Sequence, residues 1–410
     1  MLSARGFLVM GAGLSLWIVA RVAGSPTLHI VAVGLVLLPL VALLFTRRGR
    51  TRVMIRRRLS DGRATPGQRV TVEIDVHNQA STATSFLLVE DRAPTTLGRA
   101  AHLVLTGIPG HGRQRVSYTI VPHARGRYVI GPLSVDVSDP FSLTRLRLQD
   151  DQRDELLVTP ELEDLSGGDT SPFGAGVGTS SSVALFRTGE EFYTMRAYQT
   201  GDDLRRIHWP SVARTQELMI RQDESSRRAS AVLFLDTRAS ALGQVHSPGL
   251  ERAVSALASI GVLLARSGFS LRLATEQLPA VPIAEERLLE NLASVEHTHA
   301  RSLSTALGRL RSVAAADVSL IAVTAPPASH ELTALIRAGQ AFGPKVAVLV
   351  YPTDSSTLPA DRAATLEGRA SVARLSLSRA GWQVLVLPPN GRLREIWQQN
   401  LHRRPALSRS

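Results

Sequence analysis

Two long apolar runs begin the chain. Shorter apolar segments follow them, some with every second residue apolar and others continuous. Phe7–Val22 and Leu28–Phe45 are apolar apart from one Ser, one Arg and one His. As helices they would span about 24 and 27 Å, close to a hydrocarbon core of about 30 Å. The short connection Ala23–Thr27 contains Gly and Pro. The pattern predicts a two-helix transmembrane hairpin at residues 1–50.

Period-two alternation characterises the next part of the chain, residues 51–160. Val70–Val76 and Leu133–Val137 alternate apolar and polar positions, which is typical of strands with one buried face. Turn-forming segments such as Thr65–Gly67 and Pro109–Gly112 separate the runs. This pattern predicts an all-β, sandwich-like module of antiparallel strands.

Residues 161–228 hold a linker and a motif region. The stretch Ser166–Ser182 is rich in Gly and Ser. It lacks the Gly-Lys-Ser/Thr ending of a phosphate-binding P-loop and the Gly spacing of a dinucleotide site. The composition therefore favours a flexible linker over a nucleotide-binding loop.

Residues 229–400 alternate between continuous apolar runs and segments with helical spacing. Continuous apolar strands separated by helices predict a mostly parallel sheet covered on both faces, a Rossmann-type α/β domain. The predicted strands are Ala231–Leu235, Leu271–Ala274, Val318–Thr324, Val346–Tyr351 and Val384–Leu387, and the predicted helices are Leu250–Arg266, Glu285–Glu296, Leu303–Val313 and Leu332–Phe342.

The distribution of charge bears on both membrane topology and partners. The chain has a net charge of +12, and the segment from Thr46 to Val70 holds nine arginines and one acidic residue. This cluster directly follows the second apolar run, as the positive-inside rule expects of a cytoplasmic flank. No aromatic residues are interleaved with the arginines for base stacking, so a membrane flank is favoured over nucleic-acid binding.

This arrangement predicts a two-pass protein of the plasma membrane whose soluble domains face the cytoplasm. The alternative is a signal peptide cleaved near Ala23, which the second apolar run disfavours. The chain contains no cysteine, which excludes disulfides and thiolate zinc sites.

A candidate cation site follows the first predicted α/β strand. Asp236-Thr237-Arg238-Ala239-Ser240 resembles the Asp-x-Ser-x-Ser motif that begins the metal site of von Willebrand A domains. The resemblance is partial. Arg238 stands at the first serine position, Ser302 is a rough candidate for the later threonine, and Thr324-Ala325 replaces the aspartate expected after the fourth strand.

The degenerate metal-site positions are therefore Asp236, Ser240 and Ser302. A guanidinium group would repel a divalent cation, which prefers oxygen ligands. We expect no metal or other cofactor here, and Mg²⁺ is the disfavoured alternative.

A long motif lies between the linker and the α/β domain. It comprises Gly189–Tyr198 (GEEFYTMRAY), Gly201–Trp209 (GDDLRRIHW) and Ala213-Arg214. This closely resembles the signature of the domain of unknown function 58 family. Further upstream, Arg125–Tyr128, Gly131-Pro132 and Asp139–Leu143 are similar to the β region of the same family.

The residues of this motif permit a structural, a docking or a catalytic role. Asp202 is placed to cap a short helix that Pro210 interrupts. Asp203, His208 and Ser211 have side chains suited to catalysis, but the sequence shows no group that would orient them. Candidates for partner docking are Glu191, Arg196, Tyr198, Asp202, Arg205, His208, Trp209 and Arg214.

The family resemblance implies a bacterial membrane protein that accompanies a MoxR-type AAA+ ATPase. It also implies that the von Willebrand A-like domain recruits or presents client proteins. We therefore expect a non-enzymatic scaffold or adaptor with a protein partner and no nucleic acid. The alternative is a metal-assisted hydrolase that uses Asp236, Ser240 and the segment around His208.

Overall fold

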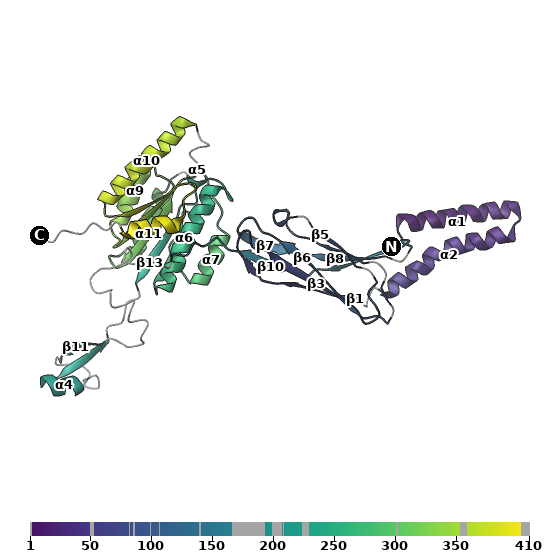
Figure 1. The fold of residues 1–410 in the computed structure, drawn as a ribbon, viewed down its shortest axis with the longest axis horizontal. Helices are drawn as coiled ribbons and strands as arrows, with labels where there is room; N and C mark the ends of the chain where they lie inside the picture. Colours follow the sequence, from purple (N-terminus) through teal and green to yellow (C-terminus); the bar gives the residue numbers. More distant parts are fainter. Residues whose placement is uncertain are drawn as a thin grey trace. The chain divides into compact units, whose positions relative to one another are not determined.

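The computed structural model describes residues 2–49, 53–81, 83–84, 87–98, 100–105, 107–138, 141–165, 193–198, 207, 209–223, 229–300, 302–352 and 359–402. The chain divides into two compact units, Met1–Pro160 and Glu161–Ser410. Each unit is described by itself (Figure 1).

The first unit begins with two antiparallel apolar helices, α1 (Ala4–Ala23) and α2 (Pro26–Gly49). Ser3 caps α1 by accepting a hydrogen bond from the Gly6 backbone at 3.1 Å. Both helices are long and apolar enough to cross a membrane. They confirm the predicted pair of apolar helices. A third helix of sufficient length and hydropathy, Pro248–Arg266, is mostly buried against the α/β sheet.

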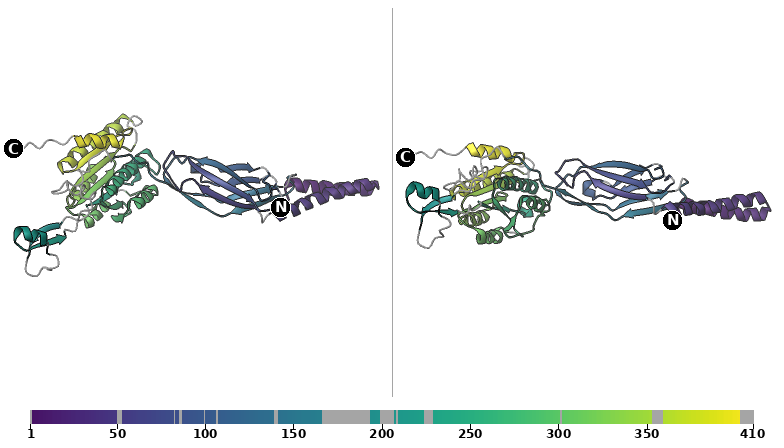
Figure 2. Two further views of the ribbon diagram at one scale, coloured as in Figure 1. Left: turned by 60° about the horizontal axis from the view of Figure 1, so that its bottom comes forward. Right: turned by 90° about the horizontal axis from the view of Figure 1, so that it is seen from below.

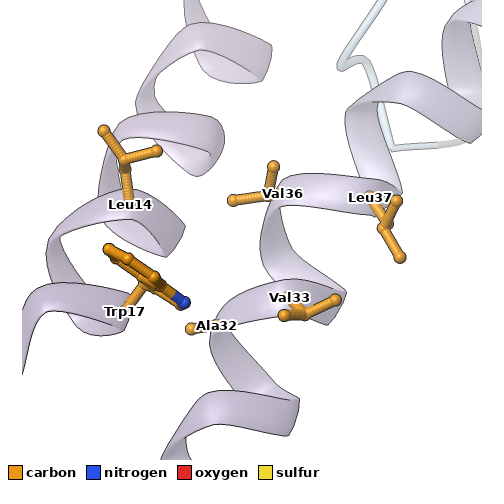
Figure 3. A pocket seen from close by; sticks show the side chains of 6 residues that line it. All are labelled: Leu14, Trp17, Ala32, Val33, Val36 and Leu37. Carbon is orange, nitrogen blue, oxygen red and sulfur yellow. The ribbon is translucent and has the colours of Figure 1, made fainter. Parts of the chain in front are cut away.

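Small residues allow α1 and α2 to approach closely. A Cβ atom at Gly13 would lie 2.9 Å from the Leu35 Cβ, so α2 occupies the space that a larger side chain would need. Beside this contact, the two helices form a groove of about 340 Å³ (Figure 3). Its lining is apolar and aromatic: Leu14, Trp17, Ala32, Val33, Val36 and Leu37. These side chains offer no acid or base, so the groove is not a candidate for catalysis.

The rest of the first unit is built of strands, as predicted. Its elements are β1 (Val53–Leu59), β2 (Arg63–Ala64), β3 (Val70–Asn78), β4 (Leu87–Asp91), η1 (Thr95–Leu97), β5 (Ala101–Leu105), β6 (Arg113–Ile120), β7 (Gly126–Ile130), β8 (Leu133–Ser138), β9 (Arg145–Asp150) and β10 (Asp154–Val158). They form sheets of order β1-β3-β6, β2-β10-β7 and β5-β4-β8-β9. In β3 every second residue is fully buried, which is the alternation seen in the sequence.

A buried charge cluster ties the strands of this module together. Arg57 in β1 donates to Asp154 at 2.6 Å, to Asp91 at 2.7 Å and to two backbone carbonyls. The Tyr118 hydroxyl donates to the other oxygen of Asp91 at 2.7 Å. Arg57 belongs to the arginine-rich segment that we assigned to the membrane flank. Its side chain is buried, so it contributes to the module interior and not to a membrane surface.

The second unit contains a six-stranded sheet of order β15-β14-β13-β16-β17-β18. All neighbours pair in parallel except β15, which is antiparallel to β14. The strands are β13 (Ser230–Leu235), β14 (Ser270–Thr275), β15 (Val281–Ile283), β16 (Val318–Thr324), β17 (Lys345–Val350) and β18 (Gln383–Leu387). This confirms the predicted mostly parallel sheet.

Helices cover both faces of the sheet (Figures 1 and 2). Leu233 and Leu235 of β13 face the core that contains α6 (Pro248–Arg266), whereas Val232 and Phe234 face the opposite core. The first core also receives α7 (Glu285–Ala293) and α11 (Leu393–His402), and the second receives α8 (Ser304–Arg309), η4 (Leu310–Val313), α9 (Ser329–Gly339) and α10 (Ala360–Arg379). Two buried faces explain the continuous apolar runs of the central strands.

The segment that follows β10 packs on the α/β domain. Ser255 of α6 donates to the Glu161 carbonyl at 2.7 Å, and Leu165 is buried in the first core. The Glu163 carboxylate accepts the backbone N–H groups of Leu393 and Arg394 at 3.0 and 2.9 Å. A negative charge at this position stabilises the start of α11.

The described part of the family motif forms a hairpin and a short helix. Here β11 (Tyr193–Ala197) pairs with β12 (Met219–Asp223) in antiparallel fashion, and α4 (Trp209–Thr215) precedes β12. The short helix that we predicted between Asp202 and Pro210 lies mostly outside the described residues, and α4 begins at Trp209 and continues through Pro210. Proline is tolerated in a first turn, where its missing N–H would have no intrahelical partner.

Candidate site at the carboxyl end of the parallel sheet

The site lies where the strand order of the α/β sheet reverses direction. The strand β13 is central, and the chain continues from it first to β14 on one side and later to β16 on the other. In open parallel sheets, ligands bind outside the carboxyl ends of the strands at such a switch point. Asp236 directly follows β13, Glu276 directly follows β14, and Thr324 ends β16. The fold therefore brings these three side chains to one edge of the sheet.

The guanidinium of Arg238 holds both oxygens of Asp236. Its Nε donates to Asp236 Oδ1 at 3.0 Å and its Nη2 donates to Oδ2 at 2.9 Å. Asp236 also accepts the Arg238 backbone N–H at 3.1 Å and the Thr324 hydroxyl at 2.7 Å. The carboxylate is fully buried, and this paired geometry compensates its charge.

The remaining side of the guanidinium reaches α9. Arg238 Nη1 donates to Glu331 Oε1, and the second oxygen of Glu331 accepts the backbone N–H of Ala328 at 3.0 Å. The Arg238 side chain is only 4% exposed. Burial alone would lower the pKa of Arg238, but Asp236 and Glu331 raise it above its usual value, so the side chain stays charged.

A third carboxyl group lies beside this ion-paired cluster. Glu276 accepts the Thr237 backbone N–H at 2.9 Å and the Thr237 hydroxyl at 2.6 Å, both at Oε2. Burial, together with the negative charge of Asp236, raises the pKa of Glu276 to about 8. Glu276 is therefore protonated at neutral pH.

The segment before α8 also contacts the loop that follows β13, through Thr298. The Thr298 backbone N–H donates to the Thr237 carbonyl at 2.7 Å, and the Thr298 carbonyl accepts the Ala239 N–H at 2.9 Å. Thr298 is buried, whereas Ser240 and Ser302 are exposed. Ser302 lies 3.0 Å from the hydroxyl of Ser304. Thr298, and not Ser302, is thus the hydroxyl residue whose backbone contacts the loop after β13.

This donor set does not fit a divalent cation. Both oxygens of Asp236 face guanidinium nitrogens, where an ion would need them as ligands. Across the part of the chain that the structure describes, no group of three or more His, Asp or Glu side chains has the arrangement of a metal site. The guanidinium takes the place that a cation would occupy beside Asp236.

Four of the eight family-motif candidates lie in the described residues, in or beside β11 and α4. Tyr198 is half-buried, and its backbone N–H donates to the Leu218 carbonyl at 2.8 Å. Trp209 is 66% exposed at the start of α4, and Arg214 is exposed near its end. Arg196 lies in β11, where only its backbone is described. Outside the described residues are Glu191, Asp202, Arg205 and His208.

Two charged residues of the strand-end site were missed from the sequence. Glu276 directly follows a predicted strand, so the convergence of strand ends could have found it. Glu331 lies in a helix, 93 residues from Arg238, and no local pattern indicates their contact. The sequence therefore showed that Arg238 is an unusual residue beside Asp236, but it did not show that Glu331 also pairs with the Arg238 side chain.

The two apolar helices fit a membrane-associated protein, and the second unit holds a mostly parallel α/β domain with an arginine at its strand-end site. The family model described as "Protein of unknown function DUF58" matches residues 194–384. This match supports the resemblance to the domain of unknown function 58 family that the motif indicated. A search of curated proteins gave no match.

Similar solved structures share little with this chain. The CARDB domain of a Pyrococcus furiosus protein is 10% identical, with a TM-score of 0.20, over 26% of this chain and 86% of that domain. The alkylpurine DNA glycosylase AlkC of Pseudomonas fluorescens is 14% identical, with a TM-score of 0.18, over 35% of this chain and 43% of that chain. Such low scores carry no argument about function.

Proposed function

We propose that this protein is a non-enzymatic, membrane-anchored adaptor that presents a von Willebrand A-like domain to a protein partner. The observation that carries the proposal is the closed site beside Asp236. Ligands of open parallel sheets bind at this edge, and here Arg238 fills it and pairs with Asp236 and Glu331. A strand-end carboxylate that is already paired with a guanidinium favours a role in protein interaction over metal binding.

The partner we propose is a MoxR-type AAA+ ATPase, as the family resemblance implies. The sheet order and the acidic residue after the first strand of the domain support a von Willebrand A-like architecture. The exposed Trp209 supports docking through the family motif, because exposed aromatic residues are frequent anchors of protein interfaces.

Recovery of the partner tests this proposal. Purification of the full chain from membranes in mild detergent is expected to recover an AAA+ ATPase. Trp209→Ala should weaken this recovery, because truncation of an interface anchor costs about 2 kcal/mol or more. Val372→Ala is the matched control, since Val372 is also exposed, at 55%, but lies on α10. Absence of any ATPase, or equal losses in both variants, would count against the proposal.

We also propose that the anchor lies in the plasma membrane with the soluble domains in the cytoplasm. Two crossings return the chain to its starting side, and arginines follow the second crossing. Protease added to right-side-out vesicles is therefore expected to leave both soluble domains intact. Their digestion before the vesicles are opened would reverse the orientation.

A titration with Mg²⁺ and Mn²⁺ distinguishes the adaptor from a metal-assisted hydrolase. We expect no binding heat from the full chain, because the guanidinium of Arg238 already occupies the oxygens of Asp236. Asp236→Ala is the informative variant. Binding that is present in the wild type and lost in this variant would favour the hydrolase.

A further inference from the structure

The β module contacts the first turn of α1 through the loop between β8 and β9. The Ser3 backbone N–H donates to the Leu143 carbonyl at 2.8 Å, and the Ser3 hydroxyl donates to the Ser142 carbonyl at 2.6 Å. Leu2 also forms an isolated antiparallel bridge with Thr144. These contacts hold the loop residues Phe141–Thr144 against the residue that caps α1.

Glycine at position 6 makes this close approach feasible. A Cβ atom at Gly6 would overlap the carbonyl oxygen of Leu143. At Gly6 the first turn of α1 therefore packs directly on the backbone of the loop. Leu143 and Thr144 are buried in this contact.

The length of α1 fixes the depth of this contact in a membrane. Ala4–Ala23 comprises 20 residues, which at about 1.5 Å per residue span the hydrocarbon core of about 30 Å. If α1 crosses the bilayer, its capping residue Ser3 lies at the boundary between the acyl chains and the headgroups. The loop that Ser3 binds must lie at the same level.

The loop presents an aromatic side chain there. Phe141 is 65% exposed, among the larger exposed fractions of the large hydrophobic residues outside the two apolar helices. Ser142 has a positive φ of 57°, a conformation that turns the chain sharply after Phe141. Arg5 is exposed in the first turn of α1. An exposed apolar ring and an exposed cation in one region of the surface are the combination that binds the headgroup region of anionic bilayers.

We propose that the Phe141–Thr144 loop is a membrane-contact element, with the Phe141 ring inserted at the headgroup–acyl boundary of the leaflet in which α1 begins. The proposal rests on the membrane anchoring proposed above and adds a second point of contact. It gives a role to Phe141, which lies in the β-region motif that the adaptor function left unexplained. The α1 helix and the loop together would hold the β module at the bilayer surface.

The absence of cysteine from the chain provides a direct test. Phe141→Cys creates a single labelling site for an environment-sensitive fluorophore in the full chain, reconstituted into vesicles of phosphatidylcholine and phosphatidylglycerol. We expect blue-shifted emission and quenching by lipids that carry a spin label at a shallow position. Spin labels deep in the acyl chains should quench less.

Two further labelling sites separate the loop proposal from the anchor proposal. Leu8→Cys reports on the anchor, because Leu8 is an exposed residue of α1, and deep spin labels should quench a fluorophore there. Asp61→Cys is the aqueous control, because Asp61 is exposed and β1 runs from Val53, near the end of α2, toward it. Quenching of the label in Leu8→Cys without quenching in Phe141→Cys would overturn the loop proposal alone. Quenching in neither variant would overturn the anchor as well.

Gly6→Val tests whether the α1 contact positions the loop. The added side chain would displace Leu143 from the first turn of α1. Combined with Phe141→Cys, it is expected to reduce shallow quenching of the label. Gly11→Val is the matched control, because no atom lies within 4 Å of a Cβ at Gly11. Equal quenching in both backgrounds would contradict positioning by this contact.

Discussion

Replacement of Arg238 by alanine should destabilise the α/β domain by about 3–5 kcal/mol, because it leaves two buried carboxylates without their counter-ion. Asp236 would keep the Thr324 hydroxyl and a backbone N–H as donors. Glu331 would keep the Ala328 N–H. Removal of one partner from a buried ion pair costs more than the pair itself contributes to stability.

Denaturant unfolding of the full chain in detergent measures this effect. Trp382 and Trp397 are buried in the α/β domain and report on it in a background of Trp17→Phe and Trp209→Phe. Arg266→Ala is the control, because the Arg266 side chain is 70% exposed and its pairing with Glu285 is exposed to solvent. We expect a change below about 1 kcal/mol for this surface pair. A similarly small change in the free energy of unfolding for Arg238→Ala would contradict the prediction, because it would mean that water solvates Asp236 and Glu331 once the guanidinium is removed.

The central strands of the α/β domain were predictable because burial on both faces leaves a continuous apolar run. Val318–Thr324 was predicted with the bounds that the structure has, and β13, β14, β17 and β18 differ from prediction by one or two residues. The β15 strand was missed because it has only three residues, one of them proline, and is mostly exposed. Edge strands lack the apolar run on which the prediction depended.

Helices with weak amphipathicity were also missed. The α10 helix, Ala360–Arg379, buries only Ala370, Ala373 and Leu377, while Val372 and Leu375 are exposed on it. An apolar residue on the solvent face blurs the helical period. Its helical structure follows from tertiary contacts with the sheet, which a pattern along one segment does not contain.

The residues of the candidate site were also only partly predictable, because a pattern along one segment does not contain tertiary contacts. The sequence indicated Asp236 because it follows a strand, and it indicated Arg238 as an anomalous cation. The charge balance of the site also depends on Glu276 and Glu331, which reach it from a neighbouring strand end and from α9. Long-range contacts of this kind decide whether a buried charge is compensated, and they follow only from the assembled sheet.

Glu276→Gln should make the α/β domain more stable than the wild type above pH 8. Burial and the adjacent Asp236 raise the pKa of Glu276 from 4.5 to about 8. Between these values the folded state keeps a proton that the unfolded state has lost, so the free energy of unfolding falls as pH rises. Above pH 8 both states are ionised and the loss is complete. The full loss is on the order of 5 kcal/mol.

Glutamine reproduces the protonated state without titrating. Its carbonyl oxygen can accept the Thr237 N–H and hydroxyl that Glu276 now accepts, and its amide remains neutral at high pH. Unfolding of the two proteins from pH 4 to pH 9 should therefore give curves that meet below pH 4.5 and separate up to pH 8. Glu286→Gln, at an exposed position of α7, is expected to follow the wild type. Parallel curves for Glu276→Gln and the wild type would contradict this prediction. They would mean that Glu276 has the same pKa in the folded and unfolded chains.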